Sequence, residues 1–174
     1  MKFRIRPETA SDLNQIANVT RQAFDSTAEV NLIEKLRKGI DFLPQLSLVA
    51  VKGHQVLGHI LFTPIRIVSE NGDPTMLLAL APMSVLPEFQ RKGVGSALIR
   101  QGLHTAKDLG YSSVIVLGHT DYYPRFGFKP ARYWNITCPF PSPDEAFMAL
   151  ELLPHALDGV AGVVEYAPAF YELE

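Results

Sequence analysis

The residues best suited to chemistry lie in one short stretch, Gln90-Arg91-Lys92-Gly93-Val94-Gly95-Ser96. An apolar run at residues 76–85 precedes it and a helical pattern at residues 94–109 follows it, so a strand should lead into a loop that opens a helix. The first amides of a helix have no intrahelical partner, and the helix dipole makes that end partly positive. The two glycines keep side chains away from those amides, and Arg91 and Lys92 add two formal charges. The stretch therefore predicts a binding site for a pyrophosphate.

Other anion-binding loops share this plan and are compared with it. A Walker loop requires a lysine followed by serine or threonine after its second glycine, whereas here Val94 follows Gly93 and Ala97 follows Ser96. A dinucleotide-binding loop requires a third glycine or alanine, and Leu98 occupies that position. The loop therefore fits both of these nucleotide-binding motifs poorly. A solvated basic turn that only caps a helix remains open on these residues alone.

A second motif, Tyr122-Tyr123-Pro124-Arg125-Phe126-Gly127-Phe128, follows a β-branched run at residues 113–117. It resembles the Tyr-x-Lys/Arg-x-Gly-Phe element of the GCN5-related N-acetyltransferase (GNAT) superfamily. Residues 90–95 resemble the Arg/Gln-x-x-Gly-x-Gly/Ala signature with which that superfamily holds the pyrophosphate of acetyl-CoA. The two motifs stand in the superfamily's order, with a helix and a strand between them, and together they are far more specific than either motif alone.

The resemblance extends over nearly the whole chain. Ile5-Arg6-Pro7 and Leu57-Gly58-His59-Ile60 are similar to the opening of the superfamily, and residues 143–150 and 159–166 are similar to its YhbS-like branch. The resemblance therefore implies an α/β (α+β) fold in a single N-acetyltransferase domain over residues 1–174. Its mixed central sheet is expected to be mostly antiparallel, to contain a βαβ unit and to be flanked by helices.

The resemblance also implies a site for acetyl-CoA at a break in the sheet. In this superfamily the strand before the loop separates from its neighbour at a bulge, and the pantetheine arm pairs with the freed backbone edge. Pro82 has no amide to donate, so it marks that place here. The resemblance thus makes Met83, Ser84 and Val85 the cofactor-facing backbone, with the amide of Val85 or a neighbour as the oxyanion donor.

The same resemblance assigns the role of general acid to Tyr123. We expect direct transfer to an amine in a ternary complex, because the sequence offers no plausible nucleophile for an acyl-enzyme. The departing thiolate needs a proton, and a tyrosine keeps its proton at neutral pH. Many family members carry an Asn and a fuller helix before the tyrosine, but here only residues 118–122 follow the strand, so Tyr122 remains an alternative acid.

The general base and the acceptor-binding residues stay open. His119 and Asp121 could deprotonate the amine, and Glu88 could do so or could simply favour the helix start electrostatically. Glu29 and Glu34 on the second predicted helix could bind a cationic acceptor, although a solvated helix face explains them as well.

Neither cysteine nor metal chemistry is indicated by the sequence. Cys138 is the only cysteine, and no motif ties a histidine or aspartate to it, so we expect an inert thiol. The histidines at positions 54, 59, 104 and 155 have no metal-ligand spacing, so no metal is expected.

A function from another class fits the loop equally well. A catalytically idle acyl-CoA-binding protein, acting as a sensor or a regulator, would need the same pyrophosphate site but neither acid nor base. The sequence supplies a good tyrosine and no clear base. The acceptor, which could be a small metabolite, an antibiotic-like amine or a protein amino group, cannot be read, and neither can the acyl chain length.

Hydrophobic periodicity predicts the elements that position these motifs. The residues 76–85, the helix after them and residues 113–117 form a βαβ unit with parallel strands. A turn is expected at Asn71-Gly72-Asp73. Strands are expected at residues 2–6, 46–51, 56–68, 76–85, 113–117, 129–137, 146–152 and 162–166, and helices at 29–38 and 94–109. A further helix of about four turns is expected after a capping-box-like start at Thr9 and Asp12, with its apolar residues at positions 13–24.

Composition bounds the class of protein. The chain has 174 residues, of which 47% are hydrophobic and 20% charged, so it can bury a substantial core. A net charge of -2 argues against a general nucleic-acid binder. One cysteine cannot form an internal disulfide, no apolar run reaches the roughly 18 residues of a membrane helix, and the N-terminus lacks a signal-peptide core. We therefore expect a soluble cytoplasmic protein without membrane or nucleic-acid partners, and a homodimer is open because dimers are common in the superfamily.

Overall fold

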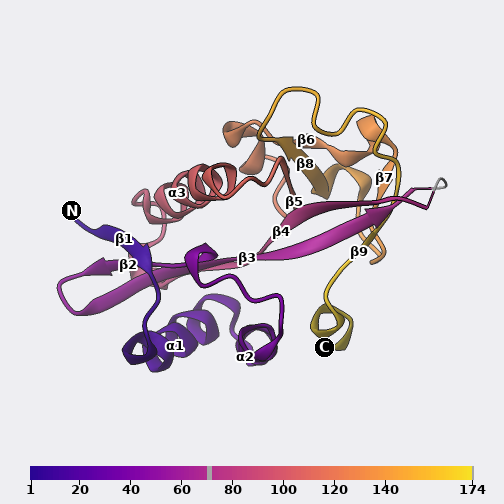
Figure 1. Cartoon of the computed structure of the whole chain (residues 1–174). Helices are drawn as coiled ribbons and strands as arrows, with labels where there is room; N and C mark the ends of the chain where they lie inside the picture. Colours follow the sequence, from indigo (N-terminus) through magenta and orange to yellow (C-terminus); the bar gives the residue numbers. More distant parts are fainter. Residues whose placement is uncertain (70–71, 174) are drawn as a thin grey trace. The chain divides into compact units, whose positions relative to one another are not determined.

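The computed structural model describes residues 1–69 and 72–173 (Figure 1). The chain divides into two units, of which unit 1 comprises Met1–Thr63, Ala81–Thr105 and Pro168–Glu174, and unit 2 comprises Pro64–Leu80 and Ala106–Ala167. The long strands β3 (Gln55–Val68) and β4 (Pro74–Val85) run through both units. The turn predicted at residues 71–73 includes Asn71, which lies outside the described residues. That residues 1–174 act as one domain stays a prediction.

Unit 1 is built on antiparallel strands from the first part of the chain. β1 (Arg4–Pro7) pairs with β2 (Ser47–Lys52), and β2 pairs with the first part of β3. A register shift between Ala50 and Val51 marks a β-bulge in the second ladder. All residues of β2 except the last are buried, which explains why this strand reads as a continuous apolar run and not as an alternating one.

Helices cover both faces of this part of the sheet, as Figure 1 shows. α1 (Leu13–Phe24) and α2 (Ala28–Lys38) lie on one face, and α3 (Val94–Asp108) lies on the other. The apolar stripe of α1 buries Ile16 and Val19 against side chains of β2 and β3. Full burial of one such side chain contributes about 1.5–3 kcal/mol, so these contacts hold α1 on the sheet.

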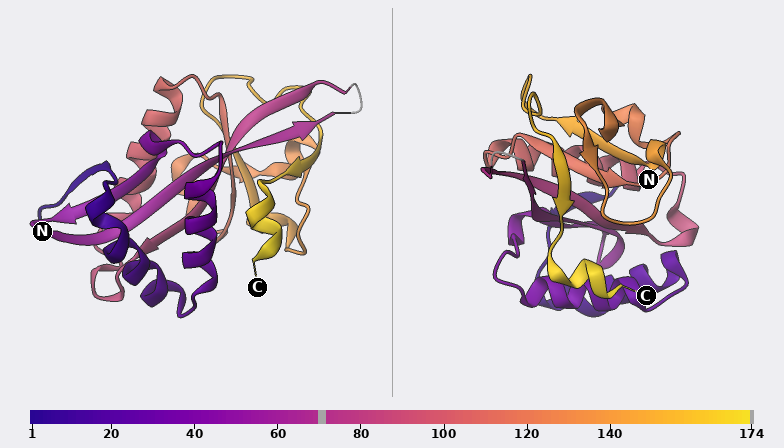
Figure 2. Two further views of the ribbon diagram at one scale, coloured as in Figure 1. Left: turned by 60° about the horizontal axis from the view of Figure 1, so that its bottom comes forward. Right: turned by 90° about the vertical axis from the view of Figure 1, so that its right-hand side faces the viewer.

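The C-terminal 3₁₀ helix η7 (Pro168–Glu172) also belongs to unit 1. It lies beside α2 in both views of Figure 2. Lys35 Nζ of α2 is 2.8 Å from Glu172 Oε2, and both side chains are about half exposed. The end of the described chain is therefore tied to the second helix by an ion pair and by packing.

Unit 2 combines parallel and antiparallel strand pairs. The middle of β4, at Leu78 and Ala79, pairs in parallel with β5 (Ser113–Leu117). β5 pairs antiparallel with β8 (Phe147–Glu151) along its whole length, and β8 pairs antiparallel with β6 (Lys129–Pro130). The parallel pair of β4 and β5, connected in the chain through α3, confirms the predicted βαβ unit.

A further strand pair covers the last part of β3. β9 (Gly162–Glu165) is antiparallel to β3 and parallel to β7 (Ile136–Thr137). The core of unit 2 forms between these strands and includes the buried side chains of Ile67, Leu77 and Phe147. Hydrogen-bonded neighbours follow the order β1-β2-β3-β4-β5-β8-β6, so the predicted mixed, mostly antiparallel sheet is confirmed.

One predicted strand, at residues 129–137, is wrong as a continuous element. The structure has the short strand β6, the 3₁₀ helix η5 (Ala131–Trp134) and the short strand β7 in its place. Pro130 cannot donate a ladder hydrogen bond, and Asn135 ends the 3₁₀ helix with a positive φ of 57°. The β-branched and aromatic composition of the segment concealed this break.

Short 3₁₀ helices complete the described chain, at Ala10–Asp12, Pro44–Leu46, Pro87–Phe89, Tyr123–Phe126, Ala131–Trp134, Asp144–Ala146 and Pro168–Glu172. Within residues 1–69 and 72–173, no helix is both long enough and apolar enough to span a membrane.

Candidate functional site

The loop between β4 and α3 has the backbone of an anion-binding turn. Arg91 and Gly93 have positive φ values of 62° and 86°, and Lys92 between them does not. Such alternation of conformation brings successive backbone N–H groups to one side of the chain. Gly93 O accepts the amide of Ala97 at 3.1 Å, so α3 starts at this point and its first-turn amides follow directly. Backbone donors and the positive end of the helix dipole therefore meet at one place.

The surface of this loop is open and cationic. Arg91, Lys92 and Gly93 are exposed, and the Lys92 ammonium lies 5.7 Å from the centre of the Phe89 ring. Beyond its chain neighbours, no atom of the described residues comes within 4 Å of where a Gly93 Cβ would lie. Glycine is therefore required at position 93 by its backbone conformation, and it leaves the approach to the helix N-terminus clear.

The loop is braced against the end of β4. Gln90 Nε2 donates to Val85 O at 3.0 Å, and the amide of Leu86 donates to Leu57 O at 2.9 Å. The amide of Phe89 donates to Leu86 O at 2.9 Å and closes the 3₁₀ helix η3 (Pro87–Phe89). The side-chain amide of Gln90, which the sequence places in the cofactor site, thus fixes the loop to the strand.

The last residues of β4 pack closely on their neighbours in unit 1. Ser84 is buried, and its Oγ lies 3.4 Å from Thr20 Oγ of α1. A Cβ at Gly58 would be 2.9 Å from Ser84 O and 3.1 Å from Leu98 Cδ1 of α3, so only glycine lets these backbones approach. Met83 is half-buried.

The strand pairing of β4 with β5 ends early. Among the described residues this ladder consists of Leu78 with Val114 and Ala79 with Ile115. It stops before Pro82, whose peptide bond with Ala81 is cis. The sequence predicts a local break of pairing near these residues, and the ladder ends where that break is expected.

Tyr123 occupies a buried aromatic pocket in unit 2. It begins the 3₁₀ helix η4 (Tyr123–Phe126), and 8% of its surface is exposed. Its ring makes T-shaped contacts with the rings of Tyr122 and Phe128, with centroid distances of 5.2 and 5.7 Å. Burial, with a smaller contribution from Tyr122, raises the pKa of Tyr123 to about 12. The phenol therefore keeps its proton at any physiological pH.

The other candidate residues occupy more ordinary positions. His119 and Asp121 are exposed in the segment between β5 and η4, and Glu88 is exposed on η3. Glu34 is exposed on α2, whereas one carboxylate oxygen of Glu29 is buried without a hydrogen-bond partner among the described residues. Within residues 1–69 and 72–173, no group of three or more histidine, cysteine or acidic side chains could hold a metal ion.

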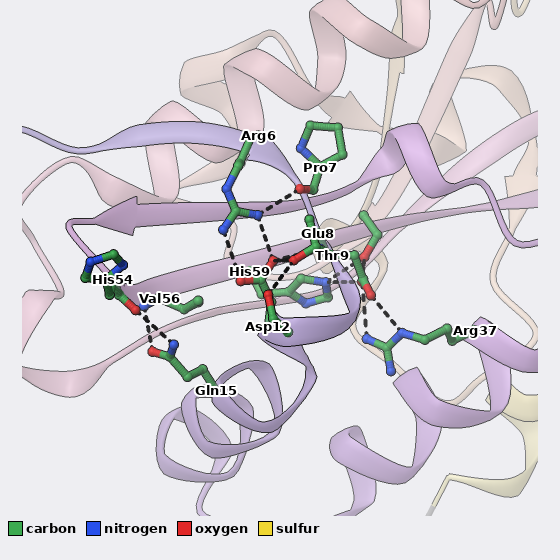
Figure 3. Close-up of polar contacts among 12 residues, drawn as sticks. Arg6, Pro7, Glu8, Thr9, Asp12, Gln15, Arg37, His54, Val56 and His59 are labelled. Carbon is green, nitrogen blue, oxygen red and sulfur yellow. Dashed lines mark hydrogen bonds and ion pairs between the residues drawn. The ribbon is translucent and has the colours of Figure 1, made fainter.

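The structure also contains a buried polar cluster that sequence reasoning missed (Figure 3). Glu8 accepts hydrogen bonds from Arg37 Nε at 2.8 Å and from the hydroxyl of Ser47. Ser47 Oγ lies 2.8 Å from Nε2 of His59, a residue with no exposed surface. Because the Ser47 proton goes to Glu8, we assign the proton of neutral His59 to Nε2. The four residues come from four separate segments, so no local pattern could join them.

The polar cluster shifts the titration of its own members. Burial alone would raise the pKa of Glu8, but contacts with His59, Arg37 and Ser47 outweigh it and lower the pKa to about 2. Burial lowers the pKa of His59 from its ordinary value, against the attraction of Glu8. His59 Nδ1 has no hydrogen-bond partner in the described chain. A carboxylate and a neutral imidazole are thus the stable forms at neutral pH.

Comparisons with known proteins bear on this geometry. The Acetyltransferase (GNAT) domain family matches residues 4–131. The N-acetyltransferase YhbS of Escherichia coli K12, itself called uncharacterized, is 34% identical over 167 residues, which are 95% of this chain and 97% of YhbS. YjhQ of the same strain, also an uncharacterized N-acetyltransferase, is 40% identical over 136 residues, 78% of this chain and 75% of YjhQ.

Solved structures agree with these sequence matches. The crystal structure of E. coli YhbS in complex with CoA has a TM-score of 0.90 and 33% identity, covering 98% of this chain and 93% of that one. A GNAT family acetyltransferase from Brucella melitensis in complex with acetyl-CoA has a TM-score of 0.79 and 35% identity, covering 97% and 98%. Profile, relatives and fold lead to one conclusion: the chain belongs to the acetyltransferase (GNAT) family.

Proposed function

We propose that this protein transfers an acetyl group from acetyl-CoA to an amine by direct transfer in a ternary complex. The observation that carries the proposal is the loop from Gln90 to Ser96. Two of its residues, Arg91 and Gly93, have positive φ, and together with the N-terminus of α3 they place backbone amides on an exposed cationic surface. Such a surface fits a pyrophosphate. The complexes of YhbS with CoA and of the Brucella protein with acetyl-CoA support this choice of ligand.

The residues that would hold acetyl-CoA come from the strand and the loop. Gln90, Arg91, Lys92, Gly93, Val94, Gly95 and Ser96 would receive the pyrophosphate, and the backbone of Met83, Ser84 and Val85 would receive the pantetheine arm. The tight packing at Gly58 and the bond from Gln90 to Val85 O support this, because they fix the strand end and the loop before any ligand arrives. A preorganised site loses less entropy on binding.

Tyr123 would act as the general acid. Acetyl-CoA supplies the acetyl group as a thioester, and its transfer to an amine releases a thiolate. The phenol of Tyr123 gives its proton to that sulfur, and the amine gives up one proton to a base or to solvent. Tyr123 then takes a proton back from that base or from solvent, so that the amide, free CoA and a protonated enzyme remain. The buried position of the ring and its raised pKa support this role, since the proton is present at every working pH. His119 and Asp121 remain candidates for the base.

Thermal unfolding with acetyl-CoA, CoA, NAD and ATP as parallel ligands tests the proposal. A ligand at about 100 times its dissociation constant stabilises a one-site protein by about 2.7 kcal/mol. For a chain of this size the unfolding temperature should rise by about 5–10 °C. We expect a rise with acetyl-CoA and CoA and none with NAD or ATP. Absence of a rise with both CoA species would overturn the pyrophosphate site.

Turnover then separates an enzyme from an acyl-CoA sensor. Release of thiol from acetyl-CoA is followed with polyamines, amino acids, aminoglycosides and peptides with free N-termini, each against a no-acceptor control. We expect slow hydrolysis without acceptor and faster release with at least one amine. Tight CoA binding with neither hydrolysis nor transfer would favour a catalytically idle acyl-CoA-binding protein.

A further inference from the structure

A glycine directly after β5 lies in unusual surroundings. Gly118 follows Leu117, the last residue of the strand, and its amide donates to Ala146 O at 3.0 Å. This bond continues the ladder with which β5 holds β8 and fixes the backbone at this point. Gly118 does not have a positive φ, unlike Gly127 in the same segment. A left-handed backbone conformation therefore does not explain why a glycine stands here.

The ring of Tyr123 supplies the explanation. A Cβ at position 118 would lie 3.0 Å from Tyr123 Cδ2, 3.4 Å from Cζ, and closer still to Cε2. Real Cβ atoms make ordinary contacts at 3.4–4 Å, so a side chain here would have to displace the ring. The phenyl ring of Tyr123 rests on the bare backbone of Gly118.

Two further aromatic rings and a set of backbone hydrogen bonds also hold this ring in place. Tyr122 and Phe128 make T-shaped contacts with the ring, at interplanar angles of 79° and 77°. The amides of Tyr122 and Tyr123 both donate to His119 O, at 3.3 and 3.4 Å. These bonds fold the segment from His119 to Tyr123 into a turn. The position of the ring is therefore fixed by these contacts together, and Gly118 lies against the side of the ring formed by Cδ2, Cε2 and Cζ.

We propose that Gly118 is a positioning residue, whose missing side chain sets where the Tyr123 hydroxyl lies. The inference rests on the proposed role of Tyr123 as general acid. Proton transfer needs heavy atoms about 2.6–3.2 Å apart, and a misplacement of about 1 Å can cost about 10²-fold in rate. One methyl group at position 118 would require a displacement of that order. Turnover thus depends on a residue that never touches the reacting atoms.

The first test is Gly118→Ala, assayed by thiol release from acetyl-CoA without added amine. We expect kcat to fall about 100-fold while KM for acetyl-CoA stays within twofold. The matched control is Gly53→Ala, in the exposed turn between β2 and β3. Apart from its chain neighbours, no atom of the described residues lies within 4 Å of the new methyl group there. Gly53 has a φ of 61°, so the control loses stability without touching Tyr123. Unchanged kcat in Gly118→Ala would overturn the proposal.

A double-mutant cycle with Tyr123→Phe separates positioning from other effects. If Gly118 acts through the hydroxyl, adding Gly118→Ala to Tyr123→Phe should not lower kcat further. Independent, additive losses would overturn the proposal. A parallel cycle uses thermal stability: Gly118→Ala should destabilise the natural protein but not the Tyr123→Ala variant, which lacks the ring. Equal destabilisation in both backgrounds would show that the ring is not what the glycine accommodates.

Titration of the tyrosines by ¹³Cζ NMR gives a readout independent of activity. The resonance lost in Tyr123→Phe identifies Tyr123 among the six tyrosines. We expect its pKa to fall from about 12 towards 10 in Gly118→Ala, because the displaced ring gains solvent. An unchanged pKa of Tyr123 would show that Gly118 does not set the position of the ring. A shifted pKa of Tyr123 in Gly118→Ala, together with full activity in Tyr123→Phe, would show that Gly118 positions the ring but that Tyr123 is not the general acid.

Discussion

At the scale of single residues, the role of Tyr123 can be tested directly. Tyr123→Phe removes one hydroxyl from a buried ring whose packing is otherwise kept. We expect kcat to fall about 10²-fold or more, since general-acid catalysis contributes on that order, while calorimetry shows acetyl-CoA affinity within twofold. Tyr133→Phe, at a position that is 65% exposed, serves as the matched control. Equal kcat at saturating substrate in both variants would remove Tyr123 from the mechanism.

Glu8 is a second residue with a sharp expected effect. Its side chain is 8% exposed and paired with Arg37, which is 20% exposed. Glu8→Gln would leave the guanidinium without its counter-ion, so we expect a loss of about 3 kcal/mol in the free energy of unfolding, measured in urea. The control is Glu165→Gln, whose ion pair with Arg66 is about half exposed, and there we expect little change. A similar loss of stability in the two variants would contradict a larger contribution from the buried pair of Glu8 and Arg37.

At the scale of elements, the turn that opens α3 is the part that decides binding. Gly93→Glu places a carboxylate where the pyrophosphate is proposed to lie, and we expect acetyl-CoA binding to disappear in calorimetry while the fold survives. Gly53→Glu adds the same charge at another exposed glycine with positive φ and should bind normally. Both variants carry backbone strain of about 1–3 kcal/mol, so stability alone cannot separate them. Normal binding by Gly93→Glu would exclude this loop.

The elements around that turn were the most predictable part of the chain. The helix that follows Gly93 was expected at residues 94–109 and is α3, Val94–Asp108. Its signal is local, because a 3.6-residue apolar period and a glycine-containing start lie within one segment. The strand expected at residues 129–137 failed for a local reason too. A proline without an N–H and an asparagine in left-handed conformation divide it, and composition outweighed both in the prediction.

Contacts between distant segments could not be predicted. His59 appears in the sequence as one of several scattered histidines, and only the fold brings Ser47 and Glu8 to it. Gly118 is likewise an ordinary glycine until the ring of Tyr123 is seen against it. Motifs that act through the backbone are readable because their geometry is local. Side-chain packing depends on the whole fold, and no periodicity in the sequence encodes it.

At the scale of the whole molecule, buried titratable groups set how stability depends on pH. His59 has a folded pKa below its ordinary 6.5, so its contribution is complete above pH 6.5 and is lost as pH falls below that value. Glu8 and Asp12 have folded pKa values of about 2, below their ordinary 4.5 and 3.8. For Asp12 the main cause is its hydrogen bond from Arg6 at 2.7 Å. Their contributions are complete above pH 4.5 and are lost towards pH 2. All three groups therefore act in the same direction.

We expect the unfolding free energy in urea to be level between pH 7 and 8 and to decline in two stages as the solution is acidified. The first decline begins near pH 6.5, with a slope of up to about 1.4 kcal/mol per pH unit for one proton, and the second begins near pH 4.5. His59→Gln keeps a hydrogen-bonding side chain beside Ser47 but cannot take up a proton, so it should remove the first decline and leave the second. Parallel curves for the two proteins between pH 7 and 5 would mean that His59 takes up its proton equally in the folded and unfolded chains. The buried cluster would then hold β1, β2, β3 and α2 together without making their stability sensitive to pH in that range.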